Sequence, residues 1–366
     1  MKKGLRFRSY YPALDGMRGL AILLVVIFHN FNFIYVSNFG WLGVDLFFVL
    51  SGYLITDILL NTYNTPNYLR NFYAKRVLRI IPLYYTSLII LLLILPPILL
   101  KPETFNYYTT NQIWLWTFLQ NWLYILKQPT GEGIMLHYWS LAVEEQFYLL
   151  WPVAVIWLKR PSLLLIFISA LLVLVLALRL YVFVTGLETI SYFNLYTFSR
   201  IDGICIGCMV ALIQRINFNF LSRYMAWIVI GFALLNFLFD FINRFYHFSF
   251  PFLALIGYTT FGMIFGMLVH ECVRAKSQWI SLIFSNPILR FFGRVSFGLY
   301  IFHWPIYLLL QPIIYAWWQN NFGRFSMLMS SLIPTLAAIV LSVLSYYYFE
   351  SRFLKLKARF EPIKHA

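Results

Sequence analysis

Arg18 and His29 frame a run of ten mostly aliphatic residues in the first apolar segment of the chain. The run predicts a membrane-embedded helix, along which the two side chains lie about 16 Å apart. Ionisable side chains in a hydrocarbon layer are costly and usually face a protein interior or a wet cavity. A cation near one membrane face and a proton-handling imidazole deeper inside would suit a long ligand that enters from one side.

His29 has a candidate carboxylate partner in the next apolar segment. Asp45 could fix the tautomer and the orientation of the imidazole, as a carboxylate does for a catalytic histidine. The alternative is that His29 is a buried structural histidine that donates to a backbone carbonyl.

Two adjacent glutamates, Glu144 and Glu145, lie about 100° apart on a helix, so only one can point squarely at a shared centre. Glu144 belongs to a polar i, i+4, i+8 stripe with Ser140 and Tyr148, and we expect it to face inward. Its alternative role is an interhelical hydrogen bond or a pairing with Arg200.

A basic cluster, Lys75, Arg76 and Arg79, precedes Pro82. Clustered Arg and Lys recognise phosphates by charge and by forked donors, and Arg18 near the same membrane face strengthens this interpretation. The alternative is a topology signal in which the cations reach toward lipid headgroups.

Four apolar segments are expected to present ionisable groups at nearly one depth, in the outer third of the membrane: His29, Asp45, the Glu144–Glu145 pair, and Arg200 with Asp202. His303 lies in the middle of another segment. Arg200, Asp202, His303 and Tyr148 are our candidates for contacts to a second substrate, although His303 could equally be a packing contact.

The composition is that of a membrane protein: 61% of the residues are hydrophobic and 11% are charged. The net charge of +15 accompanies no basic groove with interleaved aromatic residues, so we do not expect nucleic-acid binding. Cys205 and Cys208 form a C-x-x-C without a second pair or a neighbouring histidine, and we interpret them as packing residues and expect no metal.

The hydropathy pattern predicts an all-α, polytopic membrane protein, one domain over residues 1–366, with about ten transmembrane helices and both termini in the cytoplasm. Most basic residues then fall on the cytoplasmic side, as the positive-inside bias requires. The Trp-rich stretch 112–126 is interpreted as interfacial or re-entrant. The expected spans are 14–35, 41–62, 82–100, 138–158, 161–184, 199–215, 224–243, 251–272, 291–316 and 326–350.

Motifs along nearly the whole chain resemble those of the membrane-bound acyltransferase-3 family, which acylates cell-surface glycans and some small molecules in bacteria. They are Leu14-Asp-Gly-Met-Arg18 leading to His29, Gly43-Val-Asp45 through Ser51-Gly-Tyr53, Arg76-x-x-Arg79-Ile-x-Pro82, Trp139-Ser-Leu-Ala-Val-Glu144-Glu-Gln-Phe-Tyr148, Arg200-Ile-Asp202 and Ser296-x-x-x-Tyr300-x-x-His303-x-Pro305.

The resemblance implies an O-acyltransferase of the cytoplasmic (inner) membrane that moves an acyl group, most simply acetyl, from cytoplasmic acetyl-CoA to a hydroxyl of an extracytoplasmic glycan or glycolipid. His29 maps onto the essential histidine, as general base or as acyl relay. Arg18 maps onto its paired arginine, and Arg76 and Arg79 onto the basic segment, with Lys75 where many members have another arginine. The hydrolase-like domain that some members carry is not expected here.

Two other functions would also bury charges in a membrane. A transporter or flippase of lipid-linked saccharides would line its path with them, and a glycan polymerase is also polytopic and rich in Trp and Tyr. Neither has a use for coenzyme A, so consumption of a labelled thioester separates them from an acyltransferase.

Overall fold

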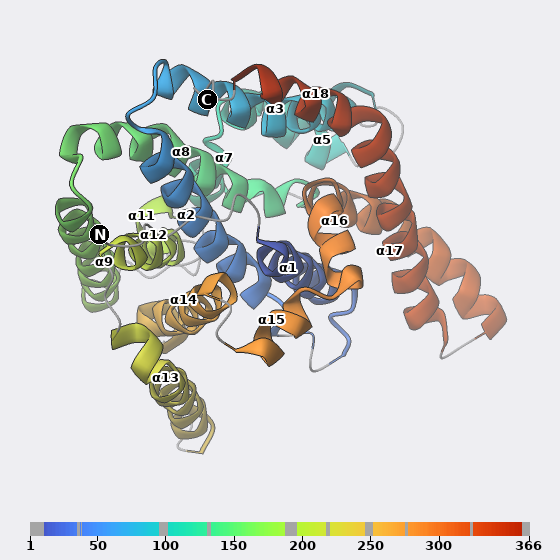
Figure 1. Ribbon diagram of the computed structural model, residues 1–366. Helices are drawn as coiled ribbons and strands as arrows, with labels where there is room; N and C mark the ends of the chain where they lie inside the picture. Colours follow the sequence, from blue (N-terminus) through green and yellow to red (C-terminus); the bar gives the residue numbers. More distant parts are fainter. Residues whose placement is uncertain are drawn as a thin grey trace.

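The computed structural model describes residues 11–34, 37, 39–94, 102–129, 133–186, 196–216, 220–245, 252–274, 277–322 and 325–360. Within these ranges the chain folds into helices and contains no strand (Figure 1). The α-helices are α1 (Pro12–Asn30), α2 (Leu42–Thr62), α3 (Tyr68–Ile89), α5 (Pro102–Thr110), α6 (Gln112–Trp116), α7 (Gln120–Leu126), α8 (Trp139–Leu158), α9 (Pro161–Val184), α11 (Thr197–Arg200), α12 (Asp202–Arg215), α13 (Phe220–Phe245), α14 (Tyr258–Arg274), α15 (Gln278–Phe284), α16 (Pro287–Phe322), α17 (Ser326–Leu344) and α18 (Ser351–Leu356). Short π-helical and 3-10 segments are η2 (Ile90–Ile94), η3 (Leu136–Tyr138), η4 (Leu253–Gly257), η6 (Ser345–Glu350) and η7 (Lys357–Phe360).

The expected all-α, multi-pass architecture is confirmed. Eight helices in the described ranges are long and apolar enough to cross a membrane. Of the other two expected spans, 199–215 corresponds mainly to α12, which has 14 residues, and 224–243 lies inside the 26-residue α13. The count of ten spans stays a prediction, as does the cytoplasmic side of both termini, which lie outside the described residues.

The third span differs from the expectation of 82–100. Its helix begins at Tyr68, and the residues from 95 to 100 lie outside the described ranges. Pro82 does not start the helix but lies inside it, which membrane helices tolerate. Residues 68–81 belong to the helix because Tyr68, Phe72 and Ile80 are buried against the bundle. The basic cluster is therefore held on a rigid helix.

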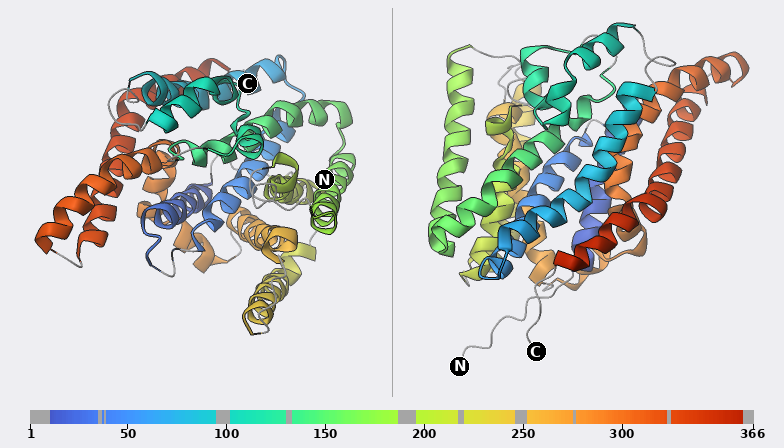
Figure 2. Two further views of the ribbon diagram at one scale, coloured as in Figure 1. Left: turned by 180° about the vertical axis from the view of Figure 1, so that it is seen from behind. Right: turned by 90° about the horizontal axis from the view of Figure 1, so that it is seen from above.

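The region 112–126 forms two short helices, α6 and α7, of five and seven residues. Neither is long enough to cross a bilayer. Together with α5 they lie at the end of the bundle opposite to the start of α3 and to α18 (Figure 2, right). This position agrees with an interfacial role.

Helices α1 and α16 pack backbone to backbone through glycines. A Cβ on Gly19 would lie 1.8 Å from the carbonyl oxygen of Leu289, and a Cβ on Gly293 would lie 1.9 Å from that of Asp15. His29 follows Gly19 by ten residues, and His303 follows Gly293 by ten. Two side-by-side helices with the same rise per residue therefore carry these histidines to the same level.

We predict that Gly293→Ala destabilises the protein by about 1–3 kcal/mol, because the added methyl group cannot fit against the α1 backbone. The thermal unfolding midpoint in detergent measures this. Gly231→Ala on α13, where a Cβ would meet nothing within 4 Å, is the control. Equal midpoints for the two variants would contradict the packing assignment.

Candidate functional site

A cavity with an empty volume of about 680 Å³ lies between α1, α2, α3, α8 and α16. Arg18, Arg76 and Arg79 border one end of this cavity. At the other end lie Ser140, near the start of α8, and Tyr300, inside α16. Its remaining lining is mixed polar and apolar: Val44, Phe47, Ser51, Ile80, Leu141, Glu144, Tyr148, Ser296 and Phe297. Its shape suits a ligand with an anionic head and a slender, less polar arm.

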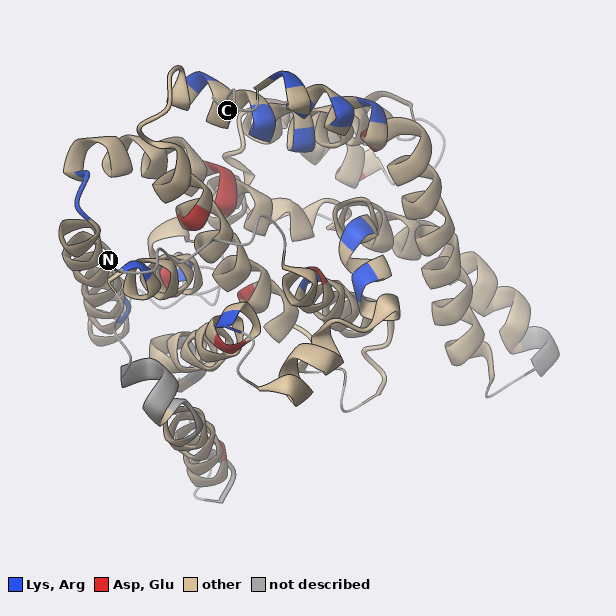
Figure 3. Cartoon of the chain, viewed as in Figure 1, with Lys and Arg blue, Asp and Glu red and all other residues tan. Residues whose placement is uncertain are grey.

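The basic residues at this end are supplied by several elements. Figure 3 shows Lys and Arg gathered along α3 and along the C-terminal helical segment beside it. Arg18, Arg76 and Arg79 also border a second cavity, which Lys75 lines as well. The structure thus brings together all four residues of the predicted anion site.

Glu144 faces the main cavity, as its polar stripe predicts. Its carboxylate accepts a hydrogen bond of 2.9 Å from the Ser51 hydroxyl and one of 3.5 Å from the Tyr148 hydroxyl. The Arg76 guanidinium lies 4.1 Å from the centre of the Tyr148 ring. Glu145 faces a separate shallow cavity at the contact of α3 and α8. Glu144 and Tyr148 therefore lie on the basic side of the bundle, not beside Arg200.

Three histidine rings lie together beyond the Tyr300 end of the cavity. The ring centres of His29 and His303 are 5.1 Å apart, and those of His303 and His137 are 5.0 Å apart. His29 is half-buried beside Trp304, whereas His303 is fully buried. His303 therefore contacts His29, and its predicted contact with an acceptor stays a prediction. Within the described residues no group of three or more His, Cys, Asp and Glu is placed to hold a metal ion.

Tyr300 separates the cavity from the histidines. Its hydroxyl shares a hydrogen bond of 2.7 Å with the Ser140 hydroxyl and donates to the backbone carbonyl of His137. His29 does not line the cavity; it lies behind Tyr300 and His303. A ligand arm that reached His29 would have to displace the Ser140–Tyr300 pair.

Asp45 does not contact His29 in the way the sequence led us to expect. Asp45 Oδ1 accepts a hydrogen bond of 2.6 Å from Arg200 Nη2, and both side chains are 4% exposed. An opposite charge in a low-dielectric interior attracts the carboxylate far more strongly than a neutral imidazole does. Asp45 and Arg200 thus form an interhelical ion pair.

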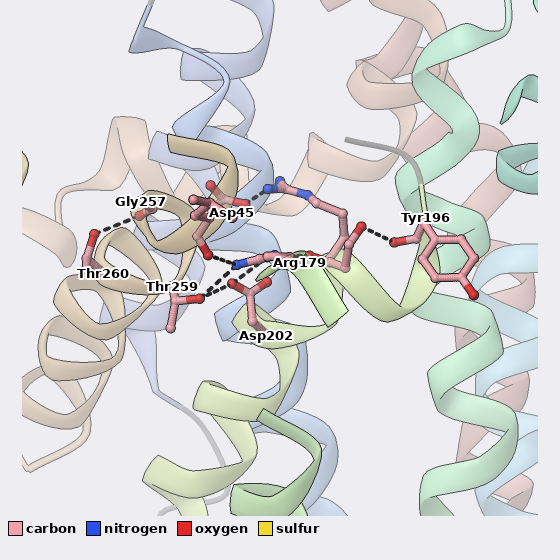
Figure 4. Close-up of polar contacts among 10 residues, drawn as sticks. Asp45, Arg179, Tyr196, Asp202, Gly257, Thr259 and Thr260 are labelled. Atoms are coloured by element: carbon pink, nitrogen blue, oxygen red, sulfur yellow. Dashed lines mark hydrogen bonds and ion pairs between the residues drawn. The ribbon is translucent and has the colours of Figure 1, made fainter. Parts of the chain in front are cut away.

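A second ion pair lies beside the first. Arg179 Nη2 is 2.9 Å from Asp202 Oδ2 (Figure 4). The Thr259 hydroxyl accepts a hydrogen bond of 3.0 Å from Arg179 and donates one of 2.7 Å to Asp202. Arg200 and Asp202 are buried in these pairs and line none of the three cavities described here, so their role in substrate contact stays a prediction. The first pair joins α2 to α11, the second joins α9 to α12, and Thr259 adds a contact from α14.

Sequence reasoning missed several residues of this region. His137, Tyr300 and Ser140 were not singled out as site residues, although all three lie in or beside motifs that were recognised. Arg179 was also missed, since a lone arginine in an apolar segment shows nothing of its partner. A sequence signal existed for Tyr300, through the spacing of Ser296, Tyr300 and His303, and for Ser140, through its polar stripe with Glu144 and Tyr148.

Comparisons with known proteins point to one chemistry. A family model described as an acyltransferase domain matches residues 11–347. The chain is 30% identical to the peptidoglycan O-acetyltransferase OatA of Listeria monocytogenes, over 96% of this chain and 57% of that protein. It is 29% identical to a putative peptidoglycan O-acetyltransferase, YrhL, of Bacillus subtilis (93% and 54%) and to a putative O-acetyltransferase of Staphylococcus aureus (94% and 58%). The chain thus spans just over half the length of these relatives. No solved structure matches it.

The ion-pair assignment of Asp45 can be tested by stability. We expect Asp45→Asn to cost about 3–5 kcal/mol, because it leaves the Arg200 guanidinium buried without a counter-charge. Asp57→Asn is the control, since its pair with Arg215 is longer, at 3.5 Å, and partly exposed, and should cost at most about 1 kcal/mol.

Thermal unfolding in detergent measures both variants. The double variant Asp45→Asn, Arg200→Met should be less destabilised than the sum of its single changes. If the Asp45→Asn protein unfolds like the wild type but has lost turnover, Asp45 acts in catalysis and not in stabilising the fold.

Proposed function

The chain belongs to the acyltransferase-3 family, and on that premise we propose that it transfers an acetyl group from acetyl-CoA to a hydroxyl of an extracytoplasmic glycan. The single observation that carries the proposal is the cavity that runs from three arginines to the neighbourhood of His29. The relatives' names make peptidoglycan the first acceptor to test. By the positive-inside rule, the arginine end faces the cytoplasm of a bacterial inner membrane.

The donor would bind with its phosphates among Arg18, Arg76 and Arg79, whose guanidinium groups suit phosphate oxygens. Its pantetheine arm would run along the cavity past Ser51 and Glu144. The match to the acyltransferase family model favours an acyltransferase over a flippase or a polymerase.

The hydrogen bonds around His303 support His29 as the proton acceptor. His303 Nδ1 lies 3.0 Å from the carbonyl oxygen of Leu299 and 2.8 Å from that of Tyr300, so in the neutral ring Nδ1 carries the hydrogen. His303 Nε2 then has a lone pair, which faces His29 Nδ1 at 3.3 Å. Val25 offers His29 Nδ1 a second acceptor at 3.0 Å. His29 Nδ1 is therefore the protonated nitrogen, and Nε2 keeps its lone pair.

That lone pair would remove the proton of the acceptor hydroxyl as the oxygen attacks the thioester carbonyl. The C–S bond breaks, the coenzyme A sulfur takes up the proton, and an ester forms. In the relay alternative, Nε2 itself attacks the thioester and the acyl group passes to the hydroxyl in a second step. Both routes need the same tautomer of His29 and the same displacement of the Ser140–Tyr300 pair.

The transfer is tested with membranes that contain the protein, labelled acetyl-CoA and separated glycan fractions. We expect label to appear as ester in glycan, and His29→Ala and His29→Asn to lower the rate by about 10²- to 10⁴-fold. Asn keeps a donor for the Val25 carbonyl but lacks the Nε2 lone pair, so it separates catalysis from helix packing. Near-normal transfer by a folded His29→Asn protein would remove His29 from the mechanism, and no thioester consumption with any glycan would favour the rivals.

The role of His303 is tested by two amide variants. In His303→Gln the amide oxygen can take the place of Nε2 and still accept from His29, whereas His303→Asn mimics only the Nδ1 side. We expect Asn to lower kcat by about 10- to 100-fold with the KM for acetyl-CoA unchanged, and Gln to stay within a few-fold of wild type. Equal activities of the two variants, at equal thermal stability, would contradict this role.

A further inference from the structure

We propose that the second cavity, which the C-terminal segment closes, binds the nucleotide end of the donor, and that Lys357 binds its 3′-phosphate. The inference deepens the proposed function, on which it rests. It defines the donor as a free coenzyme A thioester, rather than an acyl group on the phosphopantetheine arm of a carrier protein.

The second cavity has an empty volume of about 860 Å³ and shares Arg18, Arg76 and Arg79 with the first. It therefore continues the site beyond the arginines, away from Tyr300. Its walls come from α1, the C-terminal half of α2, the start of α3 and η7. A ligand that places its pyrophosphate at the shared arginines and its arm in the first cavity would have its remaining part here.

The charges of this cavity call for more than one anionic group. Lys75 and Lys357 line it in addition to the three shared arginines, and none of its lining residues is acidic. The charges of Lys75 and of the arginines all repel the Lys357 ammonium group. An anionic ligand would relieve this repulsion.

The nearby carboxylates only partly offset the cluster. Asp15 pairs with Arg18 at 3.2 Å, and the charge of Glu350 acts on Arg79. Neither carboxylate lines the cavity, and in the described part of the chain no ion pair joins Lys75, Arg76 or Lys357 to an acid. An anionic ligand of high charge is left as the complement.

The lining also suits an aromatic base. Tyr68 and Phe72 are buried side chains of α3, and Phe360 is half-buried on the C-terminal segment. Aromatic side chains provide stacking surfaces for a planar base. A nucleoside 3′-phosphate presents the base and the second anionic group together. A carrier-bound phosphopantetheine has neither, since its single phosphate is esterified to the carrier.

The test measures binding of coenzyme A and of 3′-dephospho-coenzyme A to the purified full chain in detergent. We expect wild type to bind coenzyme A about tenfold more tightly, and Lys357→Gln to lose this preference by weakening only coenzyme A binding, because one charge-assisted contact is worth about that factor. Lys355→Gln is the matched control: Lys355 lies two residues away, is exposed and lines neither cavity.

The inference is overturned if wild type binds the two ligands equally, if Lys357→Gln weakens both ligands alike, or if Lys355→Gln has the same effect as Lys357→Gln. The binding measurement tests this site, and the label-transfer assay tests the proposed function, so one can fail without the other. Tight, 3′-phosphate-dependent binding without label transfer to glycan would overturn the proposed function and leave this site standing.

Discussion

A charge between membrane helices is costly unless an opposite charge, a hydrogen-bonding partner or water faces it, and this constraint sorts the ionisable groups of the protein into two sets. Asp45 pairs with Arg200, and Arg179 pairs with Asp202, in two adjacent ion pairs with little exposure. Around the two cavities Arg18 pairs with Asp15, whereas no ion pair in the described residues joins Lys75, Arg76 or Lys357 to an acid. The first set fastens helices together, and the second leaves a site that needs an anionic ligand.

The close approach of α1 and α16 sets the position of the candidate catalytic histidine. Because Gly19 and Gly293 let the two backbones touch, the helices keep one register over the following ten residues, and His29 and His303 come within hydrogen-bond reach. In the proposed mechanism, backbone carbonyls of α16 would hold the proton on His303, and His303 would help to hold it on His29. A neutral imidazole would thus take the orienting role that a carboxylate fills in other histidine sites, without placing another charge in the membrane.

The proposed function gives the ligand path an opening and a barrier. Its opening would lie among the basic residues of α3, α1 and the C-terminal segment. Its barrier would be the hydrogen-bonded pair of hydroxyl groups, Ser140 and Tyr300. A neutral hydrogen bond of this kind is weak enough, at about 1 kcal/mol net, for a well-bound ligand to replace. In that proposal, binding energy from the phosphates would be available to bring the acyl group past Tyr300.

The sequence by itself determined the membrane class, most helix positions, the inward face of Glu144 and the family. Hydropathy and helical periodicity report these properties because each depends on one segment and its own axis. Only the tertiary structure decided that Asp45 faces Arg200 and not His29, that His303 contacts His29, and that Lys357 lines the second cavity. These contacts join residues from 155 to more than 330 positions apart in the chain. They depend on how each helix is rotated against its neighbours, and that rotation is set by packing such as the contact of Gly19 with α16, which no single segment contains.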